Sequence, residues 1–373
     1  MIPLADPGRE HARYQTEIEA AALRVLRSGH YILGPEVDAF ELAFGSYCGA
    51  KHVLGVSNGR DAIVVALQAL GVGPGDEVVT TAFSYFATAS VITRVGATPV
   101  FADIDLATFN LDPAEVERRI TPRTRAILAV HLFGRAAETD VLADLAARRG
   151  VHLVEDVAQA AGAERKGTRT GATGVIGCFS FFPAKPIGSD ADGGACTTDD
   201  DDLALRMRQV RVTGATAKNI HDLPGGNFRL DPLQAAILGA KLPHYEGRIA
   251  RRRANAESLR QGLHGVSSQL VLPTDDPDGR HVYAQFTVRH PRRDALKVAL
   301  EARGVCSEVY YPRPMPLQKV LASLGHRAGD FPQAERASAE VLSIPVHSEL
   351  DDHEVVRVAE AMREAVAEVE ALP

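Results

Sequence analysis

The stretch His52-Val53-Leu54-Gly55-Val56-Ser57-Asn58-Gly59-Arg60-Asp61-Ala62 passes from a β-branched run to an apolar helical pattern through one short turn. The same order of strand, turn and helix recurs in the residues that follow. Gly-Val-Gly-Pro-Gly at 71–75 is a strong turn signal between two of these units. Alternation of this kind predicts a mainly parallel sheet that is covered by helices on both faces.

Predicted elements divide the chain of 373 residues into two parts. Short β-branched runs predict strands at 52–56, 77–81, 98–101, 125–131 and 151–155. Ala- and Leu-rich stretches predict helices at 61–70, 87–94, 113–120, 140–149 and 201–212. Later residues predict helices at 232–242, 248–262, 293–303 and 352–369, and a strand at 282–288. Because the chain exceeds the size of a single growing core, we expect a large α/β domain at 1–245 and a small α+β domain at 246–373.

Charge and cysteine usage narrow the classes of protein. The formal net charge is −7 and Lys and Arg form no long run, so neither a nucleic acid nor a membrane is the expected partner. The four arginines within 248–253 predict a solvated helix face. The four cysteines lie far apart, which predicts neither a disulfide framework nor a metal site and suits a cytoplasmic setting. Residues 1–14 lack the apolar core of a signal peptide.

A lysine follows an apolar strand and a proline in Phe179-Ser180-Phe181-Phe182-Pro183-Ala184-Lys185, and Asp192-Gly193-Gly194 comes soon after. An amine in an apolar pocket loses part of its preference for the charged form, so its pKa falls. The neutral amine is a nucleophile for carbonyl groups, which makes Lys185 a candidate Schiff-base lysine. A surface lysine in a loop explains this segment equally well when it is taken alone.

An acid ends a predicted strand in Val154-Glu155-Asp156-Val157-Ala158-Gln159-Ala160. Ligand sites of open α/β sheets lie at the carboxyl ends of the parallel strands. A buried carboxylate keeps a pyridine nitrogen protonated, so that the ring withdraws electrons, and Asp156 is the candidate for this role. Glu155 should point to the other face because strand side chains alternate. Taken alone, the segment is more typical of a helix-capping aspartate.

Two further turns follow predicted strands. The turn at 56–62 leads into a helix N-terminus, whose free N–H groups and dipole bind phosphate. An ordinary turn that is capped by Asn58 is the alternative. In Ala82-Phe83-Ser84-Tyr85-Phe86-Ala87-Thr88 an aromatic side chain could cover a planar ring, whereas core packing is the better interpretation for Phe83 and Phe86.

Together, the order and spacing of these segments resemble the fold-type I pyridoxal 5′-phosphate (PLP) enzymes of the DegT/DnrJ type, the nucleotide-sugar aminotransferases. The resemblance runs along nearly the whole chain, through SGHYILGP (28–35), NGRDA (58–62), EDVAQAAGA (155–163), SFFPAKPIGSDADGGA (180–195), NFRLDPLQAA (227–236), VYYP (309–312) and LSIP (342–345). It implies a mainly parallel seven-stranded sheet in the large domain. It also implies an obligate homodimer with shared active sites.

The resemblance assigns roles to residues by their motifs. Lys185 matches the lysine that holds PLP covalently and shuttles protons, and Asp156 matches the partner of the pyridinium nitrogen. At the ring, the resemblance implies Gln159 at the ring hydroxyl or under the ring and Tyr85 stacked on the ring. At the phosphate, it implies Ser180 and the backbone amides of Gly59 and Arg60. Asn227 is the implied phosphate ligand from the other subunit.

Two residues depart from the pattern of the family. Arg60 stands where Thr or Ser is frequent, and Tyr310 stands where His is frequent in a segment that tends to face the sugar. The candidate substrate-binding residues are His30, Tyr31, Arg229, Tyr310, Tyr311 and Arg313. Arg229 could hold an acidic group of the sugar or the carboxylate of the amino donor, and an interface salt bridge explains it equally well.

The implied reaction moves an amino group from L-glutamate, through PLP, to a keto group of a UDP- or dTDP-linked hexose in two ping-pong halves. Segments 185–188 and 282–288 are closest to enzymes that aminate C3 in the synthesis of amino sugars for surface glycans and antibiotics. A 4-keto-sugar aminotransferase, a cyclitol aminotransferase and a non-catalytic regulator of the same fold are the alternatives. Lys185 argues against a dehydratase subgroup with His at that position, and the lack of GxGxxG after the first strand argues against a dehydrogenase.

Overall fold

The computed structural model describes residues 1–371, and a seven-stranded sheet lies at its centre in the order β1-β9-β8-β5-β4-β2-β3. The strands are β1 (His52–Val56), β2 (Glu77–Thr81), β3 (Thr98–Ala102), β4 (Thr124–Val130), β5 (His152–Asp156), β8 (Ile176–Ser180) and β9 (Gly194–Thr198). Strand β9 is antiparallel to both of its neighbours, and the other pairings in this sheet are parallel. The prediction of a mainly parallel seven-stranded sheet is therefore confirmed.

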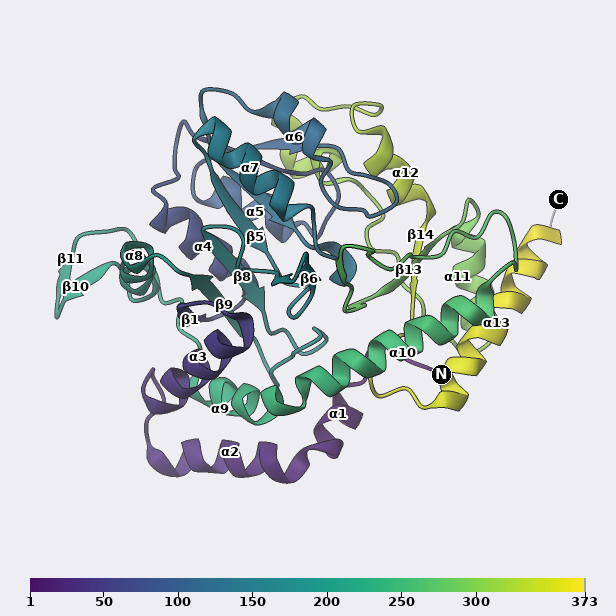
Figure 1. Cartoon of the computed structure of the whole chain (residues 1–373), viewed down its shortest axis with the longest axis horizontal. Coiled ribbons are helices and arrows are strands. Elements are labelled where there is room, and N and C mark those ends of the chain that lie inside the picture. Colours follow the sequence, from purple (N-terminus) through teal and green to yellow (C-terminus); the bar gives the residue numbers. More distant parts are fainter. Residues whose placement is uncertain (372–373) are drawn as a thin grey trace.

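Helices cover both faces of this sheet (Figure 1). Strand side chains alternate between two cores: Val78, Leu128 and Val154 pack in the cluster that contains α4 (Gly59–Ala69). Their neighbours Val79, Ile127 and Leu153 pack on the other side, in the cluster of α7 (Thr139–Arg149). The helices α5 (Ala87–Arg94) and α8 (Asp201–Arg211) contact α4, and α6 (Pro113–Arg119) contacts α7. The sheet is thus sealed from water except at its edges.

A second core forms towards the C-terminus. Its elements are α10 (Tyr245–Leu263), β13 (Phe286–Arg289), α11 (Arg293–Ala302), β14 (Val341–Ile344) and α13 (Asp352–Ala371). Strands β13 and β14 pair in antiparallel fashion. Later in the chain, η3 (Met315–Leu317), η4 (Lys319–Leu324) and α12 (Pro332–Glu340) pack in one cluster with Phe83 and with Phe101 of β3. The division of the chain after residue 245 stays a prediction. Within residues 1–371 no helix is long and apolar enough to cross a membrane.

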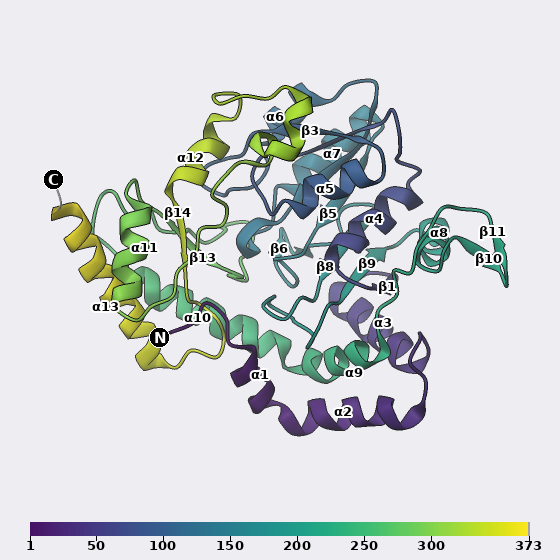
Figure 2. The same ribbon diagram turned by 180° about the vertical axis from the view of Figure 1, so that it is seen from behind.

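The N-terminal segment runs across the molecule, from the C-terminal core to the helices beside the sheet (Figure 2). Ile2 forms a parallel bridge with Val305. Then follow α1 (Pro7–Arg13), α2 (Gln15–Ser28) and α3 (Pro35–Cys48). Both α2 and α3 pack on α9 (Pro232–Lys241), which leads through η2 (Leu242–His244) into α10.

Short elements complete the fold. The hairpin of β10 (Ala215–Ala217) and β11 (Ile220–His221) projects from the body of the molecule (Figure 1). A three-stranded sheet joins β6 (Glu164–Arg165), β7 (Thr168–Arg169) and β12 (Gly279–Arg280), and η1 (Leu132–Gly134) follows β4.

Two local predictions are wrong. The strand predicted at 282–288 begins only at Phe286, because Val282 N donates to Gly134 O and Tyr283 has a left-handed φ of 48°. The solvated arginine face predicted at 248–253 is also not found: Arg248 and Arg252 are each 4% exposed, in the packed interior next to α1 and the 347–349 segment.

Candidate functional site

A buried acid and a half-buried amine lie close enough at the carboxyl edge of the sheet for their charges to interact. Asp156 ends β5 and is 6% exposed, and its carboxylate accepts hydrogen bonds from Thr88 Oγ1 and Ala158 N, both at 3.1 Å. Burial raises the pKa of Asp156, an effect that the Ala158 N–H and the charge of Lys185 oppose. Burial likewise lowers the pKa of Lys185, although the charge of Asp156 opposes it. The structure therefore brings together the two residues to which the sequence assigned the chemistry.

Glu155 points to the opposite face of β5, as the alternation of strand side chains predicted, and this prediction is confirmed. Its side chain is fully buried and accepts a hydrogen bond from His131 Nε2 at 2.9 Å. Three backbone N–H groups, those of Gly171, Thr173 and Gly174, donate to the same carboxylate. Burial alone would raise the pKa of Glu155, but these donors hold it below its usual value. Glu155 is thus a charged structural anchor next to the site.

A tight cradle forms where β1, β8 and β9 meet. Val56 and Ser180 are both register partners of Gly194, which aligns the ends of the three strands. Asn58 caps α4 through a 2.9 Å hydrogen bond from Asp61 N, as the alternative reading of this turn anticipated. In the described chain the N–H groups of Gly59 and Arg60 form no hydrogen bond, so they stay available at the helix N-terminus. A Cβ on Gly59 would lie 2.5 Å from Ser180 Cβ, so only glycine fits there.

Aromatic and amide groups surround the acid–amine pair. Tyr85 is 62% exposed, and its ring centroid lies 6.1 Å from that of Tyr311. Both ends of the Gln159 amide are engaged: Oε1 accepts from Phe133 N at 2.7 Å and Nε2 donates to Tyr311 Oη at 3.1 Å. Phe83 is fully buried, which confirms core packing for this residue. Phe86 is half-buried and packs against the hydrophobic cluster that contains Phe83.

The remaining candidates lie further along the chain. Arg229 is half-buried and bridges to Val56 at the end of β1, so it borders the cradle. Asn227 is exposed and bridges to Val212, beside the β10–β11 hairpin. Tyr310 is half-buried and Arg313 is exposed.

His30 and Tyr31 occupy the exposed turn between α2 and α3. The hydrogen bonds His30 N–Ser28 Oγ and Tyr31 Oη–Leu26 O hold this turn to the end of α2. Within residues 1–371 no hydrogen bond, ion pair or ring contact joins either residue to the acid–amine pair, and their predicted role stays a prediction.

Sequence reasoning missed two residues of the site. Thr88, 1% exposed, donates to Asp156, and His131, fully buried, links the end of β4 to Glu155. His131 directly follows β4, and Thr88 lies in α5, the helix after β2. Their positions beyond the carboxyl ends of parallel strands are the sequence signal that could have identified them.

The fold and site define an α/β protein that can bind a phosphorylated carbonyl compound next to an amine and a buried acid. The chain belongs to the DegT/DnrJ/EryC1/StrS aminotransferase family, whose sequence model matches residues 13–363. This family membership confirms the resemblance seen in the sequence.

Similar proteins cover nearly the whole chain. A "pleiotropic regulatory protein" of Geobacillus stearothermophilus is 44% identical over 97% of this chain and 98% of its own length. The dTDP-3-amino-3,4,6-trideoxy-α-D-glucose transaminase of Streptomyces venezuelae is 42% identical over 97% of this chain and 96% of its own length. The crystal structure of DesV from S. venezuelae, in complex with a ketimine intermediate, matches with a TM-score of 0.95 and 42% identity, covering 97% of this chain and 98% of that one.

Proposed function

We propose that this protein is a PLP-dependent aminotransferase that transfers the amino group of L-glutamate to the C3 keto group of a dTDP- or UDP-linked hexose. The observation that carries the proposal is the interacting pair of buried Asp156 and half-buried Lys185 beside the cradle of Gly59 and Ser180. The family of aminotransferases to which the chain belongs supports the same reaction.

The residues present fit PLP. A phosphate suits the cradle, because two free N–H groups, the helix dipole and the Ser180 hydroxyl converge where no Cβ could enter. Asp156 is a buried carboxylate whose charged form is disfavoured by burial, so a protonated ring nitrogen would supply the cation it lacks. Lys185 is close enough to Asp156 for their charges to interact, and its lowered pKa favours the neutral, nucleophilic amine.

When bound, PLP supplies an aldehyde and a ring that withdraws electrons from the reacting carbon. Lys185 would hold the bound cofactor between turnovers, and its amine, once released, would move a proton to and from the substrate carbon. Asp156 would keep a proton on the ring nitrogen, and Thr88 and Ala158 N fix the direction of its carboxylate. Gln159 and Tyr311 are tied to each other, which fixes the position of both at the site.

The choice of C3 rests on similarity. The Streptomyces relative is named for a 3-amino sugar attached to dTDP, and it is similar along almost the entire chain. Arg229 is our candidate for holding the carboxylate of glutamate, because it is half-buried beside the cradle and a guanidinium binds carboxylate with two hydrogen bonds. Tyr310 and Arg313 remain candidates for the sugar side.

A homodimer with shared sites is part of the proposal. Exposed apolar side chains include Tyr31, Ile32, Tyr85 and Phe182, each at least 52% exposed, and a partner subunit would cover them. Asn227 is exposed and bridges to Val212 at the base of the hairpin, and there it could reach the phosphate of a neighbouring subunit. The same arrangement would place His30 and Tyr31 at the partner's site. Four free cysteines support a cytoplasmic location.

One assay tests this function. Purified protein loaded with PLP is mixed with L-glutamate and a panel of 3-keto and 4-keto sugars linked to UDP or dTDP, and the aminated products are measured by mass spectrometry. We expect turnover with 3-keto sugars. Preference for a 4-keto sugar or a nucleotide-free cyclitol would overturn the assignment of the substrate. A spectrum that glutamate does not change would favour a regulator without catalysis, as the name of the Geobacillus relative suggests for that protein.

A further inference from the structure

Buried charge lies next to the turn that carries Lys185. A cavity borders the turn of residues 183–185. Its volume of about 10 Å³ is close to what one water molecule needs. It is also lined by Glu10 of α1, by Arg248 and Arg252 of α10, and by His347. These four residues are at most 5% exposed. The cavity therefore joins four segments that are far apart in the sequence.

Each of these four residues holds a buried atom that lacks a hydrogen-bond partner. Within residues 1–371 the atoms are Glu10 Oε1, Arg248 Nη1, Arg252 Nε and His347 Nδ1, four of the ten such side-chain atoms there. Unpaired buried polar atoms are rare in folded proteins, and an ordered water is their most frequent partner. Their concentration around one cavity points to a bound molecule.

The donors and acceptors define that molecule. The two arginine atoms are donors. His347 Nε2 must donate to Pro3 O, 3.2 Å away, and burial lowers the pKa of His347 to about 4, so its Nδ1 is an acceptor at neutral pH. Glu10 Oε1 is a second acceptor, 3.5 Å from the Lys241 ammonium. A halide would leave both acceptors unpaired and a metal cation would leave both donors unpaired, whereas water matches two donors and two acceptors.

We propose that the cavity holds one ordered water molecule that accepts hydrogen bonds from Arg248 and Arg252, donates to Glu10 and His347, and thereby fixes the turn that carries Lys185. The catalytic importance of this turn rests on the proposed function. The presence of the water molecule does not depend on that function.

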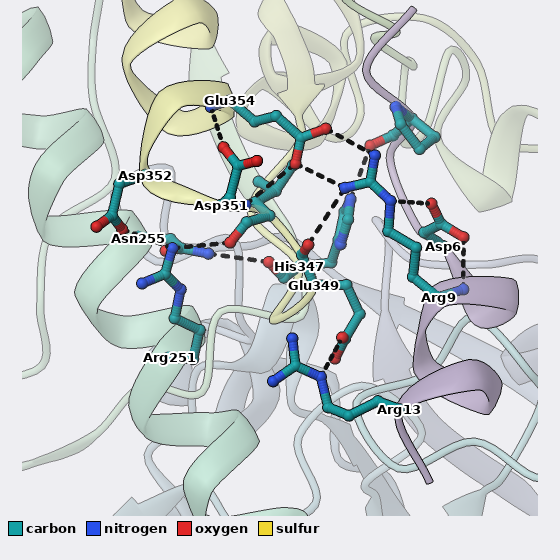
Figure 3. Close-up of polar contacts among 12 residues, drawn as sticks. Asp6, Arg9, Arg13, Arg251, Asn255, His347, Glu349, Asp351, Asp352 and Glu354 are labelled. Atoms are coloured by element: carbon teal, nitrogen blue, oxygen red, sulfur yellow. Dashed lines mark hydrogen bonds and ion pairs between the residues drawn. The ribbon is translucent and has the colours of Figure 1, made fainter. Parts of the chain in front are cut away.

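A second connection leads from Glu10 to residues 188–190, which follow the turn that carries Lys185. Lys241 Nζ, next to Glu10, donates to Gly188 O at 2.9 Å and to Asp190 at 2.6 Å. On the other side, α1 is fastened to the C-terminal core by the ion pairs of Arg9 with Glu354 and of Arg13 with Glu349, as Figure 3 shows. Glu10 thus links the fixed helix α1, through Lys241, to the segment that follows Lys185, and it is a positioning residue for Lys185.

The water is tested by a crystal structure of the wild-type protein at a resolution that shows ordered water, grown with bromide in place of chloride. We expect a density peak within hydrogen-bond distance of the four unpaired atoms, without anomalous signal. A bromide peak or an empty cavity would overturn the proposal. This readout needs no activity, so it stands even if the proposed function fails.

The positioning role is tested by Glu10→Leu, with Glu19→Leu on the exposed surface of α2 as the matched control. A displaced Lys185 should lower kcat by about 10- to 100-fold and leave KM for glutamate unchanged, because misplacement of a catalytic group affects the chemical step. The control should keep wild-type values. Equal kcat in the two variants, or an effect on KM alone, would overturn the role of Glu10.

Discussion

Replacing Glu155 by glutamine tests the network that supports the site. The carboxylate accepts hydrogen bonds from His131 at 2.9 Å and from the N–H groups of Gly171, Thr173 and Gly174 at 2.9, 2.9 and 2.7 Å. Glutamine offers one oxygen and turns an NH₂ group towards the remaining donors. At least two of the four donors then lose their acceptor, and at about 1–3 kcal/mol each the free energy of unfolding should fall by about 2–6 kcal/mol.

Thermal melts of the cofactor-free protein, followed by far-UV circular dichroism, measure this loss. We expect the Tm of Glu155→Gln to fall by about 3–8 °C, because a chain of this length has an unfolding entropy of about 0.8 kcal/mol/K. Glu19→Gln, on the exposed surface of α2, is the control and should melt like the wild type. A Tm of Glu155→Gln within about one degree of the wild type would refute the role of this carboxylate as an anchor.

The effect should depend on pH. The pKa of Glu155 in the folded protein lies below the ordinary value of 4.5, because the hydrogen bonds from His131 and the backbone outweigh burial. Its contribution to stability is therefore complete above pH 4.5 and is lost as the pH falls through the lower folded pKa. The difference in Tm between wild type and Glu155→Gln should accordingly shrink in acid.

Three further predictions concern the site itself. Because burial raises the pKa of Asp156, its charge destabilises the empty site at neutral pH, so Asp156→Asn should melt no lower than the wild type without PLP. Its turnover should nevertheless fall by at least about 100-fold, and wild-type turnover would contradict the role of this acid. In Gly59→Ala the new Cβ would lie 2.5 Å from Ser180 Cβ. Fluorescence titration should therefore show Kd for PLP rising about tenfold or more, and an unchanged Kd would exclude the cradle as the phosphate site. Mixed protomers of Lys185→Ala and Asn227→Ala should regain part of the activity that each lacks alone, whereas no regain would place Asn227 in its own subunit's site.

Local sequence patterns predicted most of the sheet. Strands β1 and β2 and helix α5 have the predicted bounds, since each combines a clear apolar pattern with a glycine or proline turn nearby. Asp156 and Lys185 could be predicted for the same reason, because each follows a recognisable strand whose carboxyl end faces the ligand side of a parallel sheet.

Other features depend on contacts that no local pattern contains. Arg248 and Arg252 look like residues of a solvated helix, and only the approach of α1 and of the 347–349 segment buries them. Val282 belongs to a strand by composition, yet its N–H is taken by Gly134 from a distant loop. Thr88 and His131 escaped notice because their importance comes from Asp156 and Glu155, which lie far away in the sequence.

The central claim is that Lys185 carries the cofactor, and chemical trapping tests it most directly. Holoprotein is reduced with borohydride, digested and sequenced by mass spectrometry, with the buried Lys241 as the internal comparison. The phosphopyridoxyl group should be found on Lys185, and the Lys185→Ala variant should remain unlabelled. A group on Lys241 or on any other lysine, or a labelled alanine variant, would contradict the assignment of the site.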